Sequence, residues 1–223
     1  MTAYDRRLTG GTVRDNGVDA RRALDVTVSA AALLVLSPLL AAIGAAVAVT
    51  MGRPVLFTQQ RSGLGGREFR IYKFRTMRAE RYPGEPDAAR LSRLGGLLRS
   101  TSLDELPQLL NVLRGDMSLI GPRPTLPEQV AHYSTRQRGR LAVRPGLTGY
   151  AQVKGRNSIS WPERIELDLA YLERRCWQVD AWIVWQTIGK LLRPEGITGE
   201  GGENPGFPIP ETAGPGAEEQ DTG

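Results

Sequence analysis

Residues 26–52, VTVSAAALLVLSPLLAAIGAAVAVTMG, carry no charged side chain and are rich in Ala, Leu and Val. A helix of this length is about 40 Å long, whereas the hydrocarbon core of a bilayer is about 30 Å thick. The segment is therefore long enough to cross a membrane with some tilt. Pro38 removes one helical hydrogen bond near the middle, and the hydroxyl of Ser37 can bind a freed carbonyl, so a bend here costs little. Each arm would then be about 20 Å long and would enter only one leaflet.

The charges that flank this segment favour a helix that enters and leaves the membrane on the same side. Arginines stand on both flanks: Arg21, Arg22, Arg53, Arg61 and Arg67. A spanning helix shows an excess of Lys and Arg on one side only. We therefore expect a re-entrant helix with both ends in the cytoplasm, in preference to a spanning helix. We do not expect a cleaved signal peptide, because the apolar run is too long and begins too far from Met1.

Two adjacent carboxylates lie in a second informative stretch, residues 100–124. Asp104 and Glu105 fall within an apolar series with steps of three and four residues: Leu103, Leu106, Leu109, Leu110 and Leu113. That spacing predicts a helix that packs by its leucines. Adjacent positions on a helix point about 100° apart, so the two acids can reach one small site in different roles. One would react, and the other would hold a metal or a proton.

A second interpretation of the acid pair is a capping box. Ser102 and Glu105 have the Ser-x-x-Glu spacing that satisfies free N–H groups, and aspartate suits the positive end of a helix dipole. For the pair alone, this structural interpretation is favoured. Pro107 stands against it, because a cap at Ser102 would place the proline one turn deeper than its preferred position. The start of the helix is therefore defined only to about one turn.

A β-hairpin is predicted after the apolar segment. Residues 54–60 (PVLFTQQ) and 67–77 (REFRIYKFRTM) are rich in β-prone residues and are joined by a glycine-rich link. Alternation places Lys73 on the face of Phe69, so that Lys73 and Arg75 leave the end of the strand toward an anion. The alternative, a solvated strand edge guarded by cations, is favoured without further context. The glycines do not form a P-loop, because no Gly-Lys-Ser/Thr follows them.

Four arginines stand at turns or beside Pro or Gly: Arg99, Arg123, Arg144 and Arg156. A fixed loop arginine can donate two hydrogen bonds to phosphate oxygens, whereas arginines on helix faces are usually solvated. An acid pair can approach a diphosphate only with the help of a divalent cation. Together these features indicate phosphate chemistry. His132 is the only histidine and has no partner at metal-binding spacing, so zinc is not expected.

Residues 161–192 are predicted to form helices. The last of them carries a broad apolar face that ends in basic residues: Trp182, Ile183, Trp185, Ile188, Lys190, Leu192 and Arg193. Trp and basic residues favour a membrane interface. A helix that faces the protein core has the same periodicity and is an equal alternative. An acid pair placed at the bilayer surface would favour the interface.

Charge is distributed unevenly along the chain. All 29 Lys and Arg precede Glu195, and seven of the 24 acids follow Arg193, so residues 1–194 carry a net charge of +12. Such a body suits anionic lipid head groups, nucleotide diphosphates or nucleic acid. The single cysteine, Cys176, excludes an internal disulfide and is expected to be a buried thiol. No internal repeat is present.

Several motifs, in this order, resemble those of the bacterial sugar transferases, the monotopic phosphoglycosyl transferases that start glycan assembly on a polyprenyl phosphate. The resemblance covers Arg21 to about Thr198 and includes the basic flank and Ser37-Pro38. Its longer motifs are YKFRTM (72–77), RSTSLDELPQ (99–108), GDMSLIGPRP (115–124), RPGLTG (144–149) and QVKGRN (152–157). The ordered set is specific, and the chain looks like the minimal, single-domain members of the family.

The resemblance implies a predominantly helical α+β fold. It consists of one catalytic domain with a small β-hairpin, anchored by a Ser-Pro-kinked re-entrant helix and by interfacial amphipathic helices. The expected divisions are an N-terminal arm (1–20), the re-entrant helix (21–53), a cytoplasmic catalytic domain (54–198) and a disordered acidic tail rich in Gly and Pro (199–223). The expected location is the cytoplasmic face of the bacterial inner membrane, without a crossing.

The activity that the resemblance implies is transfer of a phosphosugar from a UDP-sugar to undecaprenyl phosphate, with release of UMP. Carried over to this sequence, Asp104 attacks the β-phosphorus and holds the phosphosugar, and Glu105 positions Mg²⁺ beside Asp104. Asp104 must be ionised to attack, and we expect a helix N-terminus and nearby arginines to favour that form. The candidate substrate-binding residues are Lys73, Arg75, Arg99, Pro122, Arg123, Pro124, Arg144, Arg156 and Asp168. Asp116 is expected to be a turn residue.

The expected partners are the UDP-sugar, polyprenyl phosphate, membrane lipid and downstream glycosyltransferases, without nucleic acid. A competing hypothesis is a membrane-tethered basic adaptor that binds anionic lipid or nucleic acid and needs neither Asp104 nor magnesium. A third is a transferase that moves a bare sugar and releases UDP. Identification of the released nucleotide separates the three.

Overall fold

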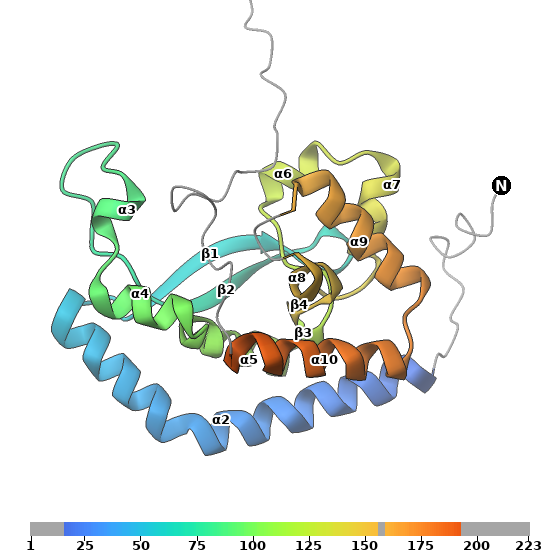
Figure 1. The fold of residues 1–223 in the computed structure, drawn as a ribbon, viewed down its shortest axis with the longest axis horizontal. Coiled ribbons are helices and arrows are strands. Elements are labelled where there is room, and N and C mark those ends of the chain that lie inside the picture. Colours follow the sequence, from blue (N-terminus) through green and yellow to red (C-terminus); the bar gives the residue numbers. More distant parts are fainter. Residues whose placement is uncertain (1–15, 156–158, 193–223) are drawn as a thin grey trace, which may run out of the picture.

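The computed structural model describes residues 16–155 and 159–192. The fold is α+β and predominantly helical, as predicted, with one long apolar helix at its N-terminal end (Figure 1). In chain order, the elements are α2 (Asn16–Met51), β1 (Leu56–Ser62), η1 (Leu64–Gly66), β2 (Glu68–Phe74), α3 (Asp87–Arg90), α4 (Arg93–Ser100), η2 (Leu103–Gln108), α5 (Leu109–Arg114), β3 (Ser118–Ile120), α6 (Pro127–Ala131), α7 (Thr135–Arg138), η3 (Gly139–Ala142), β4 (Gly146–Thr148), α8 (Tyr150–Lys154), α9 (Trp161–Glu173) and α10 (Trp177–Leu192). The predicted acidic tail and most of the predicted N-terminal arm lie outside the described residues.

Helix α2 contains the apolar segment that opened the sequence analysis. It begins at Asn16, earlier than predicted, and continues through Pro38. The Ser37 hydroxyl donates a hydrogen bond to the Leu34 carbonyl at 2.8 Å, the use expected of a serine beside a helical proline. Figure 1 shows the ribbon of α2 running below the rest of the molecule and changing direction along its length, with both ends rising toward the body. It is the only helix in the described part of the chain that is long and apolar enough to cross a membrane.

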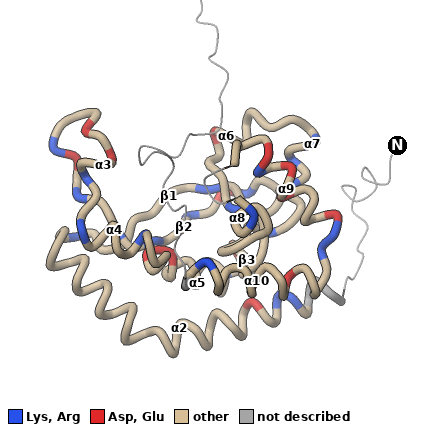
Figure 2. Tube along the Cα trace, viewed as in Figure 1, with Lys and Arg blue, Asp and Glu red and all other residues tan. Residues whose placement is uncertain are grey.

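Both halves of α2 pack against the rest of the molecule, and the stretch between these contacts does not. In the N-terminal half the Ser29 side chain is fully buried, and in the C-terminal half Val47 is fully buried. Between them, Leu34 and Val35 are 77% and 74% exposed. Figure 2 shows that the charged residues lie over the body and at the N-terminal end of α2, whereas the rest of α2 is uncharged. A large apolar surface is therefore left uncovered in the middle of the helix.

The basic flank of α2 is tied to the body by side-chain contacts. Arg22 donates hydrogen bonds to the carbonyls of Val112 (2.6 Å) and Leu113 (2.8 Å), which lie near the C-terminus of α5. Arg21 forms an ion pair with Asp180 of α10 at 2.9 Å. These arginines, which the sequence presented as a membrane flank, therefore also dock α2 onto the domain.

The predicted hairpin is confirmed. Strands β1 and β2 are antiparallel, with Leu56 opposite Phe74 and Arg61 opposite Phe69. Phe74 packs against α2 and α4 in one apolar cluster, and Phe69 packs against α5 in another. The hairpin thus lies between the membrane helix and the segment that carries the acid pair.

A short parallel pairing of β3 with β4 was not predicted. It brings the backbone of Gly121 against that of Gly146. A Cβ atom on Gly146 would lie 2.1 Å from the Gly121 nitrogen, so a side chain is excluded there. The pairing holds the Pro122–Pro124 elbow beside the loop that begins at Arg144, two motifs whose proximity the sequence did not reveal.

The predicted C-terminal helices are confirmed as α9 and α10. Ser160 caps α9 in a capping box with Glu163, which explains where the helix begins. In α10, Ile183 is fully buried, whereas Trp185 is 73% exposed and Ile188 is 48% exposed. The apolar face of α10 is therefore turned outward, which favours the interfacial alternative over a core-facing helix. The side chain of Leu192, which the prediction placed on this face, lies outside the described residues.

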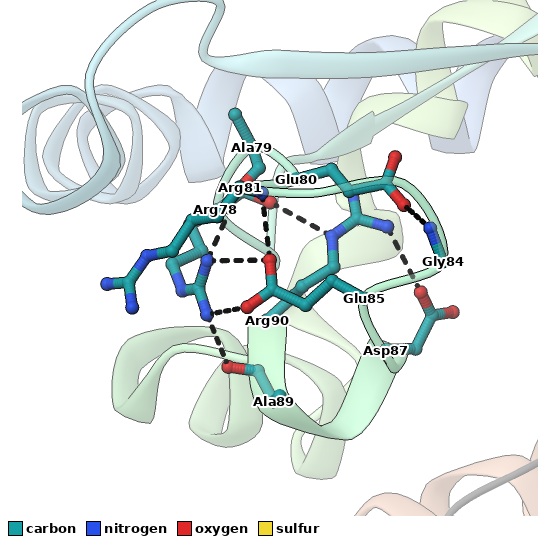
Figure 3. Close-up of polar contacts among 9 residues, drawn as sticks. All are labelled: Arg78, Ala79, Glu80, Arg81, Gly84, Glu85, Asp87, Ala89 and Arg90. Carbon is teal, nitrogen blue, oxygen red and sulfur yellow. Dashed lines mark hydrogen bonds and ion pairs between the residues drawn. The ribbon is translucent and has the colours of Figure 1, made fainter.

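Residues 78–90 form a loop that projects from the body between β2 and α4 (Figure 1). Figure 3 shows that its polar side chains bind one another. The buried carboxylate of Glu85 pairs with Arg78 and also accepts a hydrogen bond from the Arg81 backbone N–H at 2.9 Å. Arg78 further donates to the Ala89 carbonyl at 3.1 Å. The loop is thus held in shape by partners that are close in sequence.

Candidate active site

The acid pair lies in a 3₁₀ turn and not in the first turn of an α-helix. Ser102 has φ +57°, and this left-handed residue turns the chain from α4 into η2. Pro107 lies inside η2, and α5 begins only at Leu109. The predicted capping box is wrong, because the Ser102 side chain makes no capping hydrogen bond. A 3₁₀ turn accommodates Pro107, whereas an α-helix started at Ser102 would need its missing N–H.

The predicted leucine face of this segment is only partly correct. Leu109 is buried, but Leu110 is 37% exposed, and Asn111 and Val112 are fully buried in its place. Asn111 accepts a hydrogen bond from the Tyr72 N–H at 3.2 Å and donates to the Arg70 carbonyl at 2.7 Å. A buried amide therefore fastens α5 to β2. This brings the acid pair next to the end of the hairpin.

Glu105 lies between two cations from distant parts of the chain. Its Oε1 atom is 2.6 Å from Lys73 Nζ and 2.7 Å from Arg123 Nη2. Burial alone would raise the pKa of Glu105, but Arg123 and Lys73 outweigh it and hold the pKa well below its usual range. Lys73 is largely buried in this contact, so the alternative of a solvated strand edge is wrong.

Asp104 is 8% exposed, and among the described residues its carboxylate has no hydrogen-bond or ion-pair partner. Burial, together with the neighbouring charge of Glu105, raises the pKa of Asp104 to about 6. Lys73, Arg99 and Arg123 lower it, but by less. The nearby arginines favour the ionised form, as expected, but burial and the charge of Glu105 outweigh them, so the pKa of Asp104 lies above its usual value. With a pKa of about 6, the buried carboxyl of Asp104 is mostly ionised at neutral pH, and no described residue forms an ion pair or hydrogen bond with it.

Arg61 belongs to this cluster and was missed as a site residue. Its charge interacts with those of Glu105 and Arg123, and burial together with Arg123 lowers its pKa to about 10. Its Nη2 atom donates to Gln59 at 2.6 Å, and its Nε is buried without a partner in the described structure. Because Arg61 is opposite Phe69, it shares a strand face with Lys73. The register of the hairpin is the signal that places Arg61 on the face of Lys73.

The other predicted binding residues divide into two groups. Arg99 donates to the Thr76 hydroxyl at 3.0 Å and is close enough to influence Asp104. By contrast, the Arg75 guanidinium binds the carbonyls of Met51, Gly52 and Arg53 at the end of α2. Arg144 donates to the Gly115 carbonyl at 2.9 Å. These two guanidinium groups thus hold turns in place, and Arg156 lies outside the described residues.

Asp168 is fully buried and forms an ion pair with Arg140, a residue that the sequence did not single out. Arg140 also donates to the Tyr133 hydroxyl at 2.6 Å and to the Arg123 backbone carbonyl at 3.1 Å. Asp168 is therefore linked through Arg140 to the backbone of the Pro122–Pro124 elbow. The elbow in turn directs the Arg123 side chain at Glu105.

The carboxylates of Asp104 and Glu105 are the candidate ligands for a metal ion at this site. No group of three His, Cys, Asp or Glu side chains that could hold a metal occurs within the described ranges. Mg²⁺ is usually bound by one or two protein carboxylates together with substrate phosphates and water. Asp104 is unpaired, and Glu105 uses one oxygen, Oε1, for its two ion pairs. The pair therefore fits a magnesium ion that arrives with a phosphorylated substrate, held by Asp104 and Glu105.

Comparison with known proteins shows which family contains the chain that carries this cluster of two carboxylates and several cations. The family model described as "Bacterial sugar transferase" matches residues 17–194. The chain belongs to the bacterial sugar transferase family. The resemblance drawn from the motifs is thereby confirmed, and the matched region contains the acid pair, the hairpin and the elbow.

Three curated relatives match this chain over most of their own length. The chain is 45% identical over 180 residues to the uncharacterized sugar transferase EpsL of Bacillus subtilis, covering 79% of this chain and 89% of EpsL. It is 38% identical over 206 residues to the exopolysaccharide production protein ExoY of Rhizobium meliloti (83% and 91%). It is 42% identical over 200 residues to the UDP-glucose:undecaprenyl-phosphate glucose-1-phosphate transferase of Caulobacter vibrioides (82% and 72%).

Proposed function

We propose that this sugar transferase moves a phosphosugar from a UDP-sugar to polyprenyl phosphate, releases UMP and leaves a sugar on a polyprenyl diphosphate. The observation that carries the proposal is the buried carboxylate of Asp104, which has no partner among the described residues and lies beside the cations that surround Glu105. A desolvated carboxylate that forms no ion pair or hydrogen bond with protein groups is a suitable nucleophile. The name of the Caulobacter relative supports this substrate pair.

The transfer takes place in two steps at phosphorus. An Asp104 carboxylate oxygen bonds to the β-phosphorus of the UDP-sugar, the bond from this phosphorus to the bridging oxygen breaks, and UMP leaves with that oxygen. An oxygen of polyprenyl phosphate then bonds to the same phosphorus, and the bond to Asp104 breaks, which restores the carboxylate. Two anionic substrates oppose each other's approach, so the site must supply positive charge at both steps.

Each cation of the cluster has a separate place in this scheme. Lys73 and Arg123 are held by Glu105, so their remaining donors face the phosphate oxygens at a fixed angle. Arg61 has a buried Nε without a partner and can donate to the same phosphates. Arg99 also lowers the pKa of Asp104 and so compensates part of its charge. Mg²⁺, held by Glu105 and Asp104, supplies further positive charge when it is bound.

Within this proposal, α2 is a re-entrant membrane helix and the domain lies on the cytoplasmic face. The support is that Ser29 in the N-terminal half of α2 and Val47 in its C-terminal half are both buried against one domain, while Leu34 between them is 77% exposed. A straight span would carry one end away from the domain. The outward apolar face of α10 would lie in the same interface. This arrangement places the reaction at the depth of the lipid phosphate and leaves the product accessible to downstream glycosyltransferases.

The covalent step is tested with Asp104→Asn, with Asp116→Asn as the matched control. Asp116 lies near the same segment and contacts Asn111 at 3.3 Å, but no proposed step uses it. With UDP-sugar labelled at the β-phosphate, wild-type protein and the control should carry label on the chain before acceptor is added, and Asp104→Asn should carry none. Label transfer by Asp104→Asn at a rate near wild type would overturn the proposed nucleophile.

Two further measurements separate this proposal from its alternatives. Release of UDP in place of UMP would indicate transfer of a bare sugar. Binding to anionic lipid without any nucleotide release would support an adaptor. For the membrane arrangement, an N-terminal tag should be accessible from the cytoplasmic side. A tag that is accessible only from the far side would contradict the re-entrant helix.

A further inference from the structure

A second concave site lies away from the acid pair, between α8, α9 and α10. It is a groove of about 380 Å³, within the range of ordinary small-ligand sites. Apolar and aromatic side chains form much of its wall: Tyr150, Ala170, Val179 and Trp182. Figure 1 shows these helices together on the side of the molecule where α10 runs along α2. None of these residues takes part in the proposed transfer.

The groove carries two cations that no acid neutralises. Lys154 Nζ lies 5.6 Å from the ring centre of Tyr150 and 5.4 Å from that of Trp182. Arg174 lies on the same groove. Across the described ranges, neither cation forms an ion pair, and the buried acid Asp180 is already bound to other residues. The groove is thus apolar along its wall and positive at its polar groups, which matches an amphiphile with an anionic head.

The groove is continuous with the apolar surface of α10. Trp182 lines the groove and is also 36% exposed, and Trp185 and Ile188 continue the exposed apolar surface along the helix. Tryptophan at this position is typical of the boundary between lipid tails and head groups. An acyl chain in the groove would therefore lie at the depth of the bilayer. The groove would not need to extend further into the protein to hold it.

We infer that this groove binds one anionic membrane phospholipid, with an acyl chain along Val179 and Trp182 and the phosphate at Lys154 and Arg174. Charge complementarity favours an anionic head, because a zwitterionic head would bring its own cation to two cations that are already unneutralised. The bound lipid would set the depth and the orientation of α10 in the interface. The inference rests on the groove alone and does not depend on the role of Asp104.

The test compares lipids that stay bound to the full chain. The protein is placed in nanodiscs of phosphatidylcholine that contain a minor fraction of phosphatidylglycerol, is released into mild detergent and is examined by native mass spectrometry. Wild type should retain one phosphatidylglycerol in preference to phosphatidylcholine. The variant Lys154→Gln/Arg174→Gln should retain less, by about fivefold for each cation removed. The control Arg67→Gln/Arg70→Gln removes two exposed arginines from the hairpin and should behave as wild type.

A second variant blocks the groove without a change in charge. Ala170→Trp fills the groove from α9 and should also lose the retained lipid, although both cations remain. A circular dichroism spectrum and a thermal unfolding midpoint close to those of wild type show that each variant is folded. Equal retention of the two lipids, or equal loss in the hairpin control, would overturn the inference. So would one-for-one displacement of phosphatidylglycerol by undecaprenyl phosphate, which would make the groove the acceptor site, or a dimer that Ala170→Trp disrupts.

Discussion

Two glutamates of this transferase are held by cations in different ways. The partners of Glu85 are Arg78 and the Arg81 N–H, which lie within seven residues of it in its own loop (Figure 3). The partners of Glu105 are Lys73 and Arg123, which are 32 and 18 residues away along the chain. The first network closes on itself and holds the projecting loop in shape. The second joins a strand, a 3₁₀ turn and a proline elbow.

The two networks differ in the polar groups that they leave without a partner. Around Glu85, the loop's own groups satisfy both carboxylate oxygens. Around Glu105, an unpaired carboxylate and an unpaired guanidinium nitrogen remain, on Asp104 and Arg61. Buried polar groups without partners are costly, so a protein retains them where a ligand supplies the missing contacts. Guanidinium nitrogens without a partner also occur on Arg75 and Arg140, so the feature that distinguishes the candidate active site is the carboxylate of Asp104, which has no partner among the described residues.

The largest expected effect tests whether an ion pair between residues distant in sequence is by itself the sign of an active site. Asp168 and Arg140 are distant in sequence, and their buried side chains form an ion pair with each other, so we expect a structural role for the pair. Asp168→Asn leaves Arg140 as an uncompensated buried charge and should lower the free energy of unfolding by about 3–5 kcal/mol. Denaturant titration in detergent measures this. The double variant Asp168→Leu/Arg140→Met should recover most of the loss, and an unchanged midpoint for Asp168→Asn would contradict the structural role.

The next effect concerns catalysis. Glu105→Gln removes the charge that orients Lys73 and Arg123, so both side chains lose their fixed direction toward the phosphates. We expect UMP release to fall by about 10²–10³-fold. The matched change in the loop, Glu85→Gln, should leave the rate unchanged. A rate for Glu105→Gln within about tenfold of wild type would remove the distinction drawn between the two glutamates.

The pH dependence follows from the raised pKa of Asp104. Below a pH of about 6 the carboxyl is protonated and cannot attack, so covalent labelling should fall tenfold for each pH unit at low magnesium. Mg²⁺ at the acid pair favours the ionised form, so the midpoint should move to lower pH as magnesium is raised. A midpoint that does not depend on magnesium would argue against a metal at this pair.

The same pKa predicts the effect of Asp104 on stability. The folded chain binds the Asp104 proton more tightly than the unfolded chain, so ionisation of this carboxyl above pH 6 disfavours the fold. Asp104→Asn should therefore raise the melting temperature at pH 7 and should not raise it at pH 4. Thermal unfolding at both pH values, with Asp116→Asn as the control, measures the difference.

The smallest effect is expected in the projecting loop. The hydrogen bonds from Arg78 and the Arg81 N–H hold the pKa of Glu85 below its usual range. The stability that they provide is therefore present above the pKa of an unfolded glutamate and is lost as the pH falls through the folded value. Glu85→Gln should make residues 78–90 more sensitive to protease at neutral pH. The exposed Asp87→Asn is the control, and equal cleavage of both variants would contradict the role of Glu85.

Much of the fold was predictable from local patterns. The apolar run of residues 26–52, the hairpin and the C-terminal helices follow from periodicity and turn chemistry, which act over a few residues. Asp104, Glu105 and Arg123 were predicted to be site residues because of their residue types and their neighbours in the sequence. Arg61, Asn111 and Arg140 were missed, because a single arginine or asparagine acquires a role only from the element packed against it.

The amino-acid sequence by itself determined the membrane segment, the hairpin, the acid pair and the family, since each depends on residues that are adjacent or evenly spaced. Only the tertiary structure decided which charges meet. It brought Lys73 and Arg123 to one oxygen of Glu105, left Asp104 without a partner among the described residues, and placed Arg75 against the end of α2 and Asp168 against Arg140. The physical reason is that burial and Coulomb interaction depend on distance in space, which the spacing of residues along the chain does not specify.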